Sequence, residues 1–277
     1  MWPVGKHEDD ESIMAVTTWP TVLSEEATIT KLHEGYSLAR YGDAELSMMQ
    51  GKDSFHEPAN PALAAELRQI LLEPATQCLR GIPTMDPRGP KYAGWMTRRE
   101  VFAAFLSPDG PYGSAFVSRE DAAPWIGTPA YAEYVRAVWH NKKVALVCEP
   151  NNVLWLSIAY RARKVVYVPC PYRETFGALP AIERDVLHCR PDCVVLACGA
   201  AATVLAHRLT QRGIQALDLG SIGPLLARYL PERLMGASLV TLRHPVCCDS
   251  RSQRALLQQA GFEVLAMSES IGGDRHG

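Results

Sequence analysis

The chain has 277 residues, of which 47% are hydrophobic and 21% charged. These proportions exclude an intrinsically disordered chain, which combines low hydrophobicity with high net charge. Lys and Arg together number 28 and Asp and Glu 30, so the formal net charge is −2 and the basic excess of a dedicated nucleic-acid-binding protein is missing. The length fits one large α/β domain, with or without a small appendage.

Neither end of the sequence predicts a membrane or secretory segment. No apolar run approaches the 18 or so residues that span a bilayer, and the acidic N-terminus lacks the hydrophobic region of a signal peptide. None of the eight cysteines forms a CxxC pair, which favours reduced structural thiols over a redox or metal-binding role. We therefore expect a cytoplasmic protein.

The first half of the chain reads as a tail followed by alternating helices and strands. Residues 1–22 form the predicted tail. Ser24 is a candidate N-cap and Gly35 a candidate stop for the first helix. Apolar residues then recur at helical spacing after Asn60-Pro61. The predicted elements are helices over 25–34, 62–77 and 97–106, and strands over 36–41 and 78–82.

The second half is more regular, and it decides the predicted fold class. Continuous apolar runs alternate with amphipathic segments, as expected for strands that helices cover on both faces. We predict a Rossmann-like α/β domain over residues 23–230, with a doubly wound, mostly parallel sheet. Residues 231–277 repeat the pattern once, either as a βαβ extension of the sheet or as a small subdomain. The predicted strands are 143–148, 164–168, 193–198 and 214–219, and the predicted helices are 152–162, 175–187 and 201–212.

Ligands of open α/β sheets lie beyond the carboxyl ends of the strands. The segment Gly199 to Thr203 follows one such strand and opens a helix whose first N–H groups are unpaired. It is a candidate phosphate cradle, although a plain tight turn is the alternative. It contains neither a GxGxxG fingerprint nor a Walker lysine.

Two carboxylates, Asp43 and Glu45, follow the first predicted strand. In extended backbone, side chains two residues apart point the same way, and hard cations prefer carboxylate oxygens together with substrate phosphates. Arg40 beside them suits a diphosphate. The pair is therefore a candidate Mn²⁺ or Mg²⁺ site, and a solvated acidic turn is the alternative.

Two further strand ends carry candidate ligands. Asn151 and Asn152 follow one strand, where one is expected to cap the next helix and the other to contact a ligand. Asp218 ends another strand and either accepts from a ribose hydroxyl or caps a helix.

Five segments in this order resemble the GT-D-type glycosyltransferases over about residues 35–230. They read RYGDAEL, VCEPNN, VVYVPCPYRETF, VVLACGAAATVLAHRL and IQALDLGSIG. The resemblance implies transfer of a sugar from a nucleotide sugar, commonly a UDP-sugar, to a glycan or other hydroxyl acceptor, with a divalent metal at Asp43 and Glu45. It leaves open whether the chain assembles with copies of itself.

The resemblance also implies roles for residues outside the acidic pair. Arg119, in a segment AFVSR with Phe116 and Ser118, would act in catalysis. The remaining residues would bind the donor or its metal: Arg40, Gly42, Asn151, Asn152, Pro169, Phe176, Gly199, Ala202, Thr203 and Asp218.

The chain departs from the family pattern at three loop positions. Ala44 replaces a glycine between the two acids, Glu149 replaces the glycine before Pro150, and Ala201 replaces a hydroxyl-bearing residue. An acid at position 149 would repel a diphosphate if it pointed inward.

The sequence leaves the catalytic base and two rival functions open. An inverting transfer needs a base for the acceptor hydroxyl, and the candidates are Asp53, His56, Glu57, Asp121 and His207, the last more readily explained as a packed helix residue. The rivals are a non-catalytic nucleotide-sugar or carbohydrate-binding module and another nucleotide-using α/β transferase.

Overall fold

The structure is a computed structural model that describes residues 19–73, 77–87, 89, 91–107, 110–149, 158, 160–220, 222–229 and 263–264. In this part of the chain, eight strands form one sheet in the order β3-β2-β1-β7-β6-β4-β5-β8, and every neighbouring pair is parallel. The strands are β1 (Ser37–Arg40), β2 (Cys78–Ile82), β3 (Gly113–Ser114), β4 (Lys143–Cys148), β5 (Lys164–Pro169), β6 (Cys193–Ala197), β7 (Gln215–Asp218) and β8 (Glu263–Val264).

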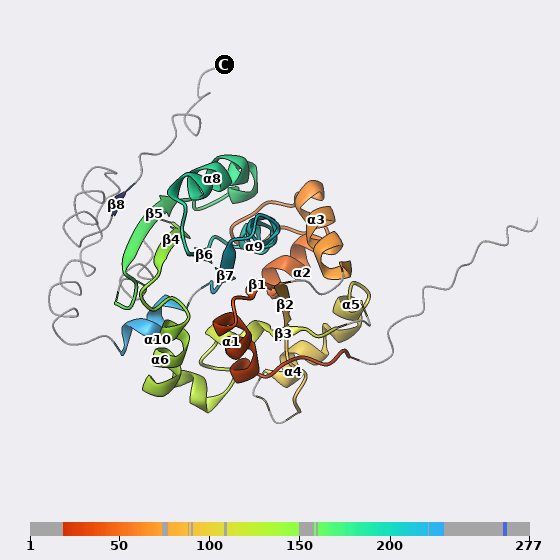
Figure 1. Cartoon of the computed structure of the whole chain (residues 1–277). Coiled ribbons are helices and arrows are strands. Elements are labelled where there is room, and N and C mark those ends of the chain that lie inside the picture. Colours follow the sequence, from red (N-terminus) through yellow and green to blue (C-terminus); the bar gives the residue numbers. More distant parts are fainter. Residues whose placement is uncertain are drawn as a thin grey trace, which may run out of the picture.

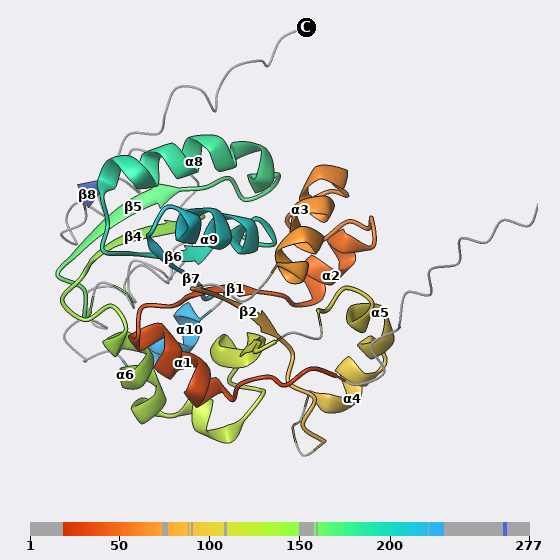
Figure 2. The same ribbon diagram turned by 45° about the vertical axis from the view of Figure 1, so that its right-hand side comes forward.

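Helices cover both faces of this sheet. Figure 2 shows α3, α8 and α9 on one face and α1, α6 and α10 on the other, and Figure 1 gives the same grouping from a second direction. The described helices are α1 (Glu25–His33), α2 (Asp43–Met49), α3 (Pro61–Leu72), α4 (Tyr92–Met96), α5 (Arg99–Ala103), α6 (Pro129–Ala137), α8 (Thr175–Cys189), α9 (Ala201–Gln211) and α10 (Gly223–Ala227). The predicted fold class, a doubly wound parallel α/β sheet, is confirmed.

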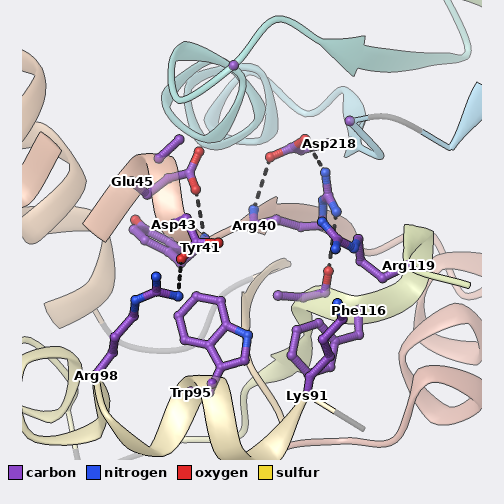
Figure 3. Close-up of a pocket in the computed structure, with 16 residues that line it drawn as sticks. Arg40, Tyr41, Asp43, Glu45, Lys91, Trp95, Arg98, Phe116, Arg119 and Asp218 are labelled. Carbon is purple, nitrogen blue, oxygen red and sulfur yellow. Dashed lines mark hydrogen bonds and ion pairs between the residues drawn. The ribbon is translucent and has the colours of Figure 1, made fainter. Parts of the chain in front are cut away.

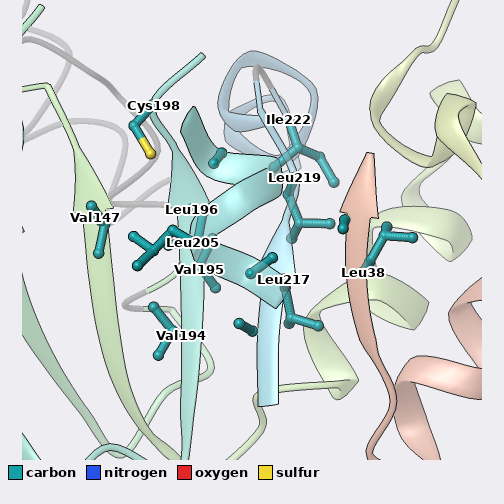
Figure 4. Close-up of a cluster of buried hydrophobic side chains, with 14 of the residues drawn as sticks. Leu38, Val147, Val194, Val195, Leu196, Cys198, Leu205, Leu217, Leu219 and Ile222 are labelled. Atoms are coloured by element: carbon teal, nitrogen blue, oxygen red, sulfur yellow. The ribbon is translucent and has the colours of Figure 1, made fainter. Parts of the chain in front are cut away.

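The core lies between the central strands and these helices. Leu38 of β1, Leu217 of β7 and Val195 of β6 have no exposed surface, and Leu205 of α9, near Val195 in Figure 4, is equally buried. Strands buried on both faces explain why their sequences are continuous apolar runs rather than alternating ones. The six described cysteines are buried, and no disulfide joins any two of them, as expected for structural thiols.

Three helix starts follow from local capping by the N-cap side chain. The side chains of Ser24, Asn60 and Thr128 accept from backbone N–H groups in the first turns of α1, α3 and α6. By contrast, α8 has no side-chain cap of its own, because Glu174 precedes it in the left-handed region. Glu57, from the loop before α3, accepts from the Phe176 N–H at 2.8 Å instead.

The predicted strands of the second half agree with the observed ones to within one or two residues, whereas the first half differs more. The sequence pattern does not predict α2, α4 or α6, and the helices predicted over 62–77 and 97–106 are observed as the shorter α3 and α5. The sequence predicts a loop at Asp43 and Glu45, but these residues form the first turn of α2. Seven of the eleven residues of the predicted helix over 152–162 lie outside the described residues. In the predicted extension 231–277 only β8 is described, and it pairs in parallel with β5, so its domain organisation remains a prediction.

Within the described ranges, none of the helices is long and apolar enough to cross a bilayer.

Candidate active site

A cavity of about 410 Å³ opens at the carboxyl ends of β1 and β7. These two strands are neighbours where the halves of the sheet meet: β2 and β3 lie on one side, and β6, β4, β5 and β8 on the other. Such a switch point is where doubly wound sheets bind their ligands. The cavity is lined by Arg40, Tyr41, Gly42, Asp43, Ala44, Glu45, Lys91, Gly94, Trp95, Arg98, Ala115, Phe116, Arg119, Gly199, Asp218 and Gly220.

Arg40 and Asp218 hold the floor of the cavity together. The Arg40 Nη2 lies 3.4 Å from Asp218 Oδ1, and the Arg40 backbone N–H donates to Oδ2 at 3.3 Å (Figure 3). The same guanidinium donates through Nη1 to the Ser118 hydroxyl and to the Ala115 carbonyl, at 2.5 and 3.2 Å. The Arg40 side chain is only 16% exposed, so these partners fix its position.

Burial, rather than the arginine, dominates the titration of Asp218. Loss of solvent raises the pKa of the Asp218 carboxyl, and Arg40 opposes that rise only in part. A buried acid and a buried arginine therefore depend on one another for compensation at this point of the cavity.

The two predicted metal ligands do not point the same way, which corrects the expectation. Asp43 and Glu45 are i and i+2 on a helix, and such positions do not share a face. The Asp43 carboxylate is 65% exposed and pairs with Arg98 at 2.5 Å. Glu45 turns inward, and its Oε2 accepts from the Gly42 N–H at 2.7 Å, which caps α2 (Figure 3).

The environment of Glu45 makes it a weak acid. Burial, followed by repulsion from Asp218, raises the pKa of Glu45 to about 7, against the stabilising hydrogen bond from Gly42. At neutral pH this side chain is therefore distributed between its carboxylate and carboxylic acid forms.

The opposite wall of the cavity was not anticipated from the sequence. Lys91, Trp95 and Arg98 come from the segment that contains α4 (Figure 3). Their spacing of four and then three residues places them on one helical face, and this was the signal available in the sequence. Phe116 and Arg119, which the family resemblance did select, complete this wall.

The cations of this wall are paired with exposed acids. Arg119 donates to both carboxylate oxygens of Asp121 at 3.0 and 2.9 Å, and Lys91 pairs with the same acid. Exposed ion pairs contribute little net stability. An incoming polyanion can therefore take Lys91, Arg98 and Arg119 from these partners at small cost.

The turn before α9 contributes backbone to the cavity but not the threonine hydroxyl. Gly199 lines the cavity with φ +64°, and the start of α9 has no side-chain cap. The Ala202 N–H donates to the Gly199 carbonyl at 3.0 Å. Thr203 is fully buried, and its hydroxyl donates to the Arg40 carbonyl at 2.7 Å, so it joins α9 to β1.

Thr203 can therefore have a structural role, through its hydrogen bond to Arg40, or the predicted role of contacting a phosphate, and one variant distinguishes the two. We expect Thr203→Val to lower the free energy of unfolding by about 1 kcal/mol, because it removes one buried hydrogen bond. The binding of UDP, the ligand that the family resemblance implies, should be unchanged. Urea unfolding and calorimetric titration with UDP measure the two quantities. Weakened UDP binding with unchanged stability would contradict the structural role and favour the predicted phosphate contact.

Several sequence-predicted residues lie elsewhere. Pro169 ends β5, and Phe176 lies in the first turn of α8 with Arg208 over its ring; neither lines the cavity, and neither does Glu149. Ser118 is buried behind Arg40. Asn151 and Asn152 fall outside the described residues.

The structure places the candidate catalytic bases in different parts of the molecule. His207 is buried and contacts Glu73 at 2.7 Å, Glu57 caps α8, and Asp53 accepts from the Ala59 N–H. His56 abuts the cavity-lining Gly199: a Cβ placed on that glycine would lie 3.2 Å from the His56 Cβ.

The donor chemistry of the site suits a divalent cation in part. Asp43, Glu45 and Asp218 line one cavity and offer the oxygen ligands that Mn²⁺ or Mg²⁺ prefers. Asp43 is available once Arg98 moves, whereas Glu45 is engaged by Gly42. Over the described ranges, no three His, Cys, Asp or Glu side chains are grouped as a complete metal site, so a cation here would need ligands from substrate and water.

Comparison with known proteins identifies the family. Residues 38–230 match the family model described as "Glycosyltransferase GT-D fold". The chain belongs to this family. The resemblance seen in the five sequence segments is thereby confirmed, and it covers the strands and loops that form the cavity.

Two curated relatives agree with the GT-D assignment. The "Probable glycosyl transferase Gly" of Streptococcus gordonii is 28% identical over 69% of this chain and 30% of its own length. "Glycosyltransferase GlyD" of Streptococcus pneumoniae is 26% identical over 67% of this chain and 25% of its own. This chain therefore spans less than a third of the length of these two curated relatives.

Solved structures of the same fold are also similar. One, described as showing that "domain of unknown function 1792 has a distinct glycosyltransferase fold", is 24% identical over 76% of this chain and 81% of its own, with a TM-score of 0.68. A second, "A New Glycosyltransferase (DUF1792) from Streptococcus sanguinis", is 26% identical over 79% of this chain and 87% of its own, with a TM-score of 0.67.

Proposed function

We propose that this GT-D chain transfers a sugar from a nucleotide-sugar donor, of the UDP-sugar class, to a hydroxyl of a glycan. One observation carries the proposal: the acidic segment after β1 and the glycine turns before α9 and after β7 line the same cavity as Lys91, Arg98 and Arg119. A cavity that combines partly exposed cations with glycine backbone suits a diphosphate. Trp95 and Phe116, whose ring centroids lie 6.4 Å apart, provide apolar surface for the rest of the donor.

The chemistry of sugar transfer explains why cations are needed here. Breaking the bond between the anomeric carbon and the diphosphate leaves negative charge on the departing group. Positioned cations stabilise that charge as it develops. Arg40 is held in place before the donor arrives, while the exposed cations can follow the diphosphate.

A divalent metal fits this site at Asp43, with Glu45 as a second ligand if it leaves its cap. When bound, Mn²⁺ or Mg²⁺ would supply further charge stabilisation to the diphosphate. The exposed Asp43 carboxylate is the side chain free to contribute without rearrangement of α2.

The donor class and the metal are tested together by thermal unfolding. We expect UDP to raise the melting temperature, and UDP with Mn²⁺ to raise it further, because ligands that bind the native state stabilise it by mass action. Asp43→Asn should abolish the additional Mn²⁺-dependent rise. Asp192→Asn is the matched control, since Asp192 is also an exposed acid paired with an arginine but lies immediately before β6.

Two outcomes would contradict these assignments. A Mn²⁺-dependent rise that survives in Asp43→Asn would remove Asp43 as the metal ligand. Stabilisation by ATP or S-adenosylmethionine instead of UDP would favour another nucleotide-using transferase.

Slow release of UDP from a UDP-sugar by the wild type, lost on Arg40→Ala, would distinguish an enzyme from a binding module.

A further inference from the structure

An exposed group of aromatic rings lies outside the cavity and has no part in the donor site. It consists of Phe55, His56 and Tyr172, which we call the aromatic cluster. Phe55 is 68% exposed and Tyr172 48%. The ring centroids lie 4.8 Å apart for Phe55 and His56, 6.0 Å for Phe55 and Tyr172, and 5.1 Å for His56 and Tyr172. Exposed aromatic side chains that contact one another form a continuous surface on which a ligand can pack.

The cluster is built by two segments that are far apart in the sequence. His56 Nδ1 hydrogen-bonds the Tyr172 carbonyl at 3.0 Å, and the Glu174 N–H donates to the His56 carbonyl at 3.0 Å. Glu57 then holds the start of α8 through the Phe176 N–H. These bonds hold the two segments together and orient the His56 ring before any ligand binds, which lowers the entropic cost of binding.

The hydrogen bond between His56 Nδ1 and the Tyr172 carbonyl determines the tautomer of the neutral histidine ring. A carbonyl only accepts, so the proton of the neutral ring must sit on Nδ1. The Nε2 atom then carries the lone pair and accepts a hydrogen bond from a hydroxyl.

The cluster adjoins the cavity at Gly199. A Cβ on this glycine would lie 3.2 Å from the His56 Cβ, and the φ of +64° favours glycine there. No side chain therefore separates the histidine from the glycine that lines the cavity. The other large exposed apolar side chains of the described residues, Leu72 and Val101, lie on α3 and α5 instead.

We infer that the aromatic cluster binds a pyranose residue of the acceptor glycan. A pyranose with equatorial hydroxyls presents C–H groups on its faces and hydroxyls at its rim. Phe55 and Tyr172 supply apolar ring surface for a face, and His56 Nε2 accepts from a hydroxyl at the rim. The inference rests on the proposed function, because it assigns the acceptor side of the same transfer.

The test is a titration of the full chain with methyl β-D-glucopyranoside, in which saturation-transfer NMR detects binding. We expect the wild type to transfer saturation to the sugar ring protons. The double variant Phe55→Ala/Tyr172→Ala should bind about tenfold more weakly, because two aromatic contacts are lost. Leu72→Ala, which removes another exposed apolar side chain, should bind as the wild type does.

Each other outcome counts against the inference. Absence of saturation transfer in the wild type, or undiminished transfer in the double variant, would overturn it. So would a concentration-dependent dimer that only the double variant loses, since the cluster would then be a contact between copies of the chain. The UDP-dependent melting shift is measured on the same samples: its absence in the wild type would refute the donor proposal alone, and its retention in the double variant shows that the fold and donor site are intact.

Discussion

Gly220→Ala is expected to lower the free energy of unfolding by about 3 kcal/mol. Gly220 has φ +49°, and a Cβ there would lie 2.1 Å from Arg40 Nη2. The substitution therefore adds a strained left-handed backbone to the displacement of a guanidinium that Asp218 and Ser118 hold. Because Arg40 must leave its place on the cavity floor, we also expect UDP affinity to fall by about tenfold or more.

Gly213→Ala distinguishes the effect of backbone strain from the effect of displacing Arg40. Gly213 has a similar φ of +76°, but a Cβ placed on it would meet no atom within 4 Å. This variant should lose only about 1 kcal/mol, from the strained backbone alone, and should bind UDP normally. Equal losses in urea unfolding of the two variants, or unchanged UDP binding by Gly220→Ala, would show that Arg40 is not constrained as described.

Glu45→Gln is expected to stabilise the metal-free protein at pH 8 by about 3 kcal/mol. The folded state raises the pKa of Glu45 from 4.5 to about 7. Between these two values the unfolded chain has lost its proton while the folded chain keeps it. Stability therefore falls as pH rises through this window, and the loss is complete above pH 7.

The glutamine variant tests this linkage without removing the helix cap. Its amide oxygen still accepts from the Gly42 N–H, as Glu45 does, and it carries no charge that Asp218 would repel. Urea unfolding in EDTA should give equal stability for wild type and variant at pH 4.5 and a widening difference up to pH 8. Glu34→Gln, at an exposed position, should show no such divergence. Parallel pH profiles for wild type and Glu45→Gln would contradict the raised pKa.

The acidic pair shows where reasoning from the sequence stops. The string Asp43-Ala44-Glu45 identifies oxygen ligands after a strand, and the structure places both acids at the cavity. Their directions depend on α2, which begins at Asp43 because Glu45 caps its own first turn. A short helix with a glycine N-cap has weak sequence signals, so a loop is the natural expectation.

Thr203 is a second residue whose role could not be predicted from the sequence. A hydroxyl in the first turn of a helix after a glycine suits a phosphate by pattern alone. Its actual partner, the Arg40 carbonyl, lies 163 residues away in sequence. Only the packing of α9 against β1 and β7 brings the two together.

Local pattern was sufficient for the fold class and for one wall of the cavity. Apolar runs of strand length, alternating with helical spacing, determine a parallel sheet, and the carboxyl ends of its strands must meet at one edge. The wall with Lys91, Trp95 and Arg98, the pairing of Arg40 with Asp218, and the meeting of Phe55 with Tyr172 were decided by tertiary structure. These contacts join segments far apart in the chain, and their energies depend on burial that no local window of sequence contains.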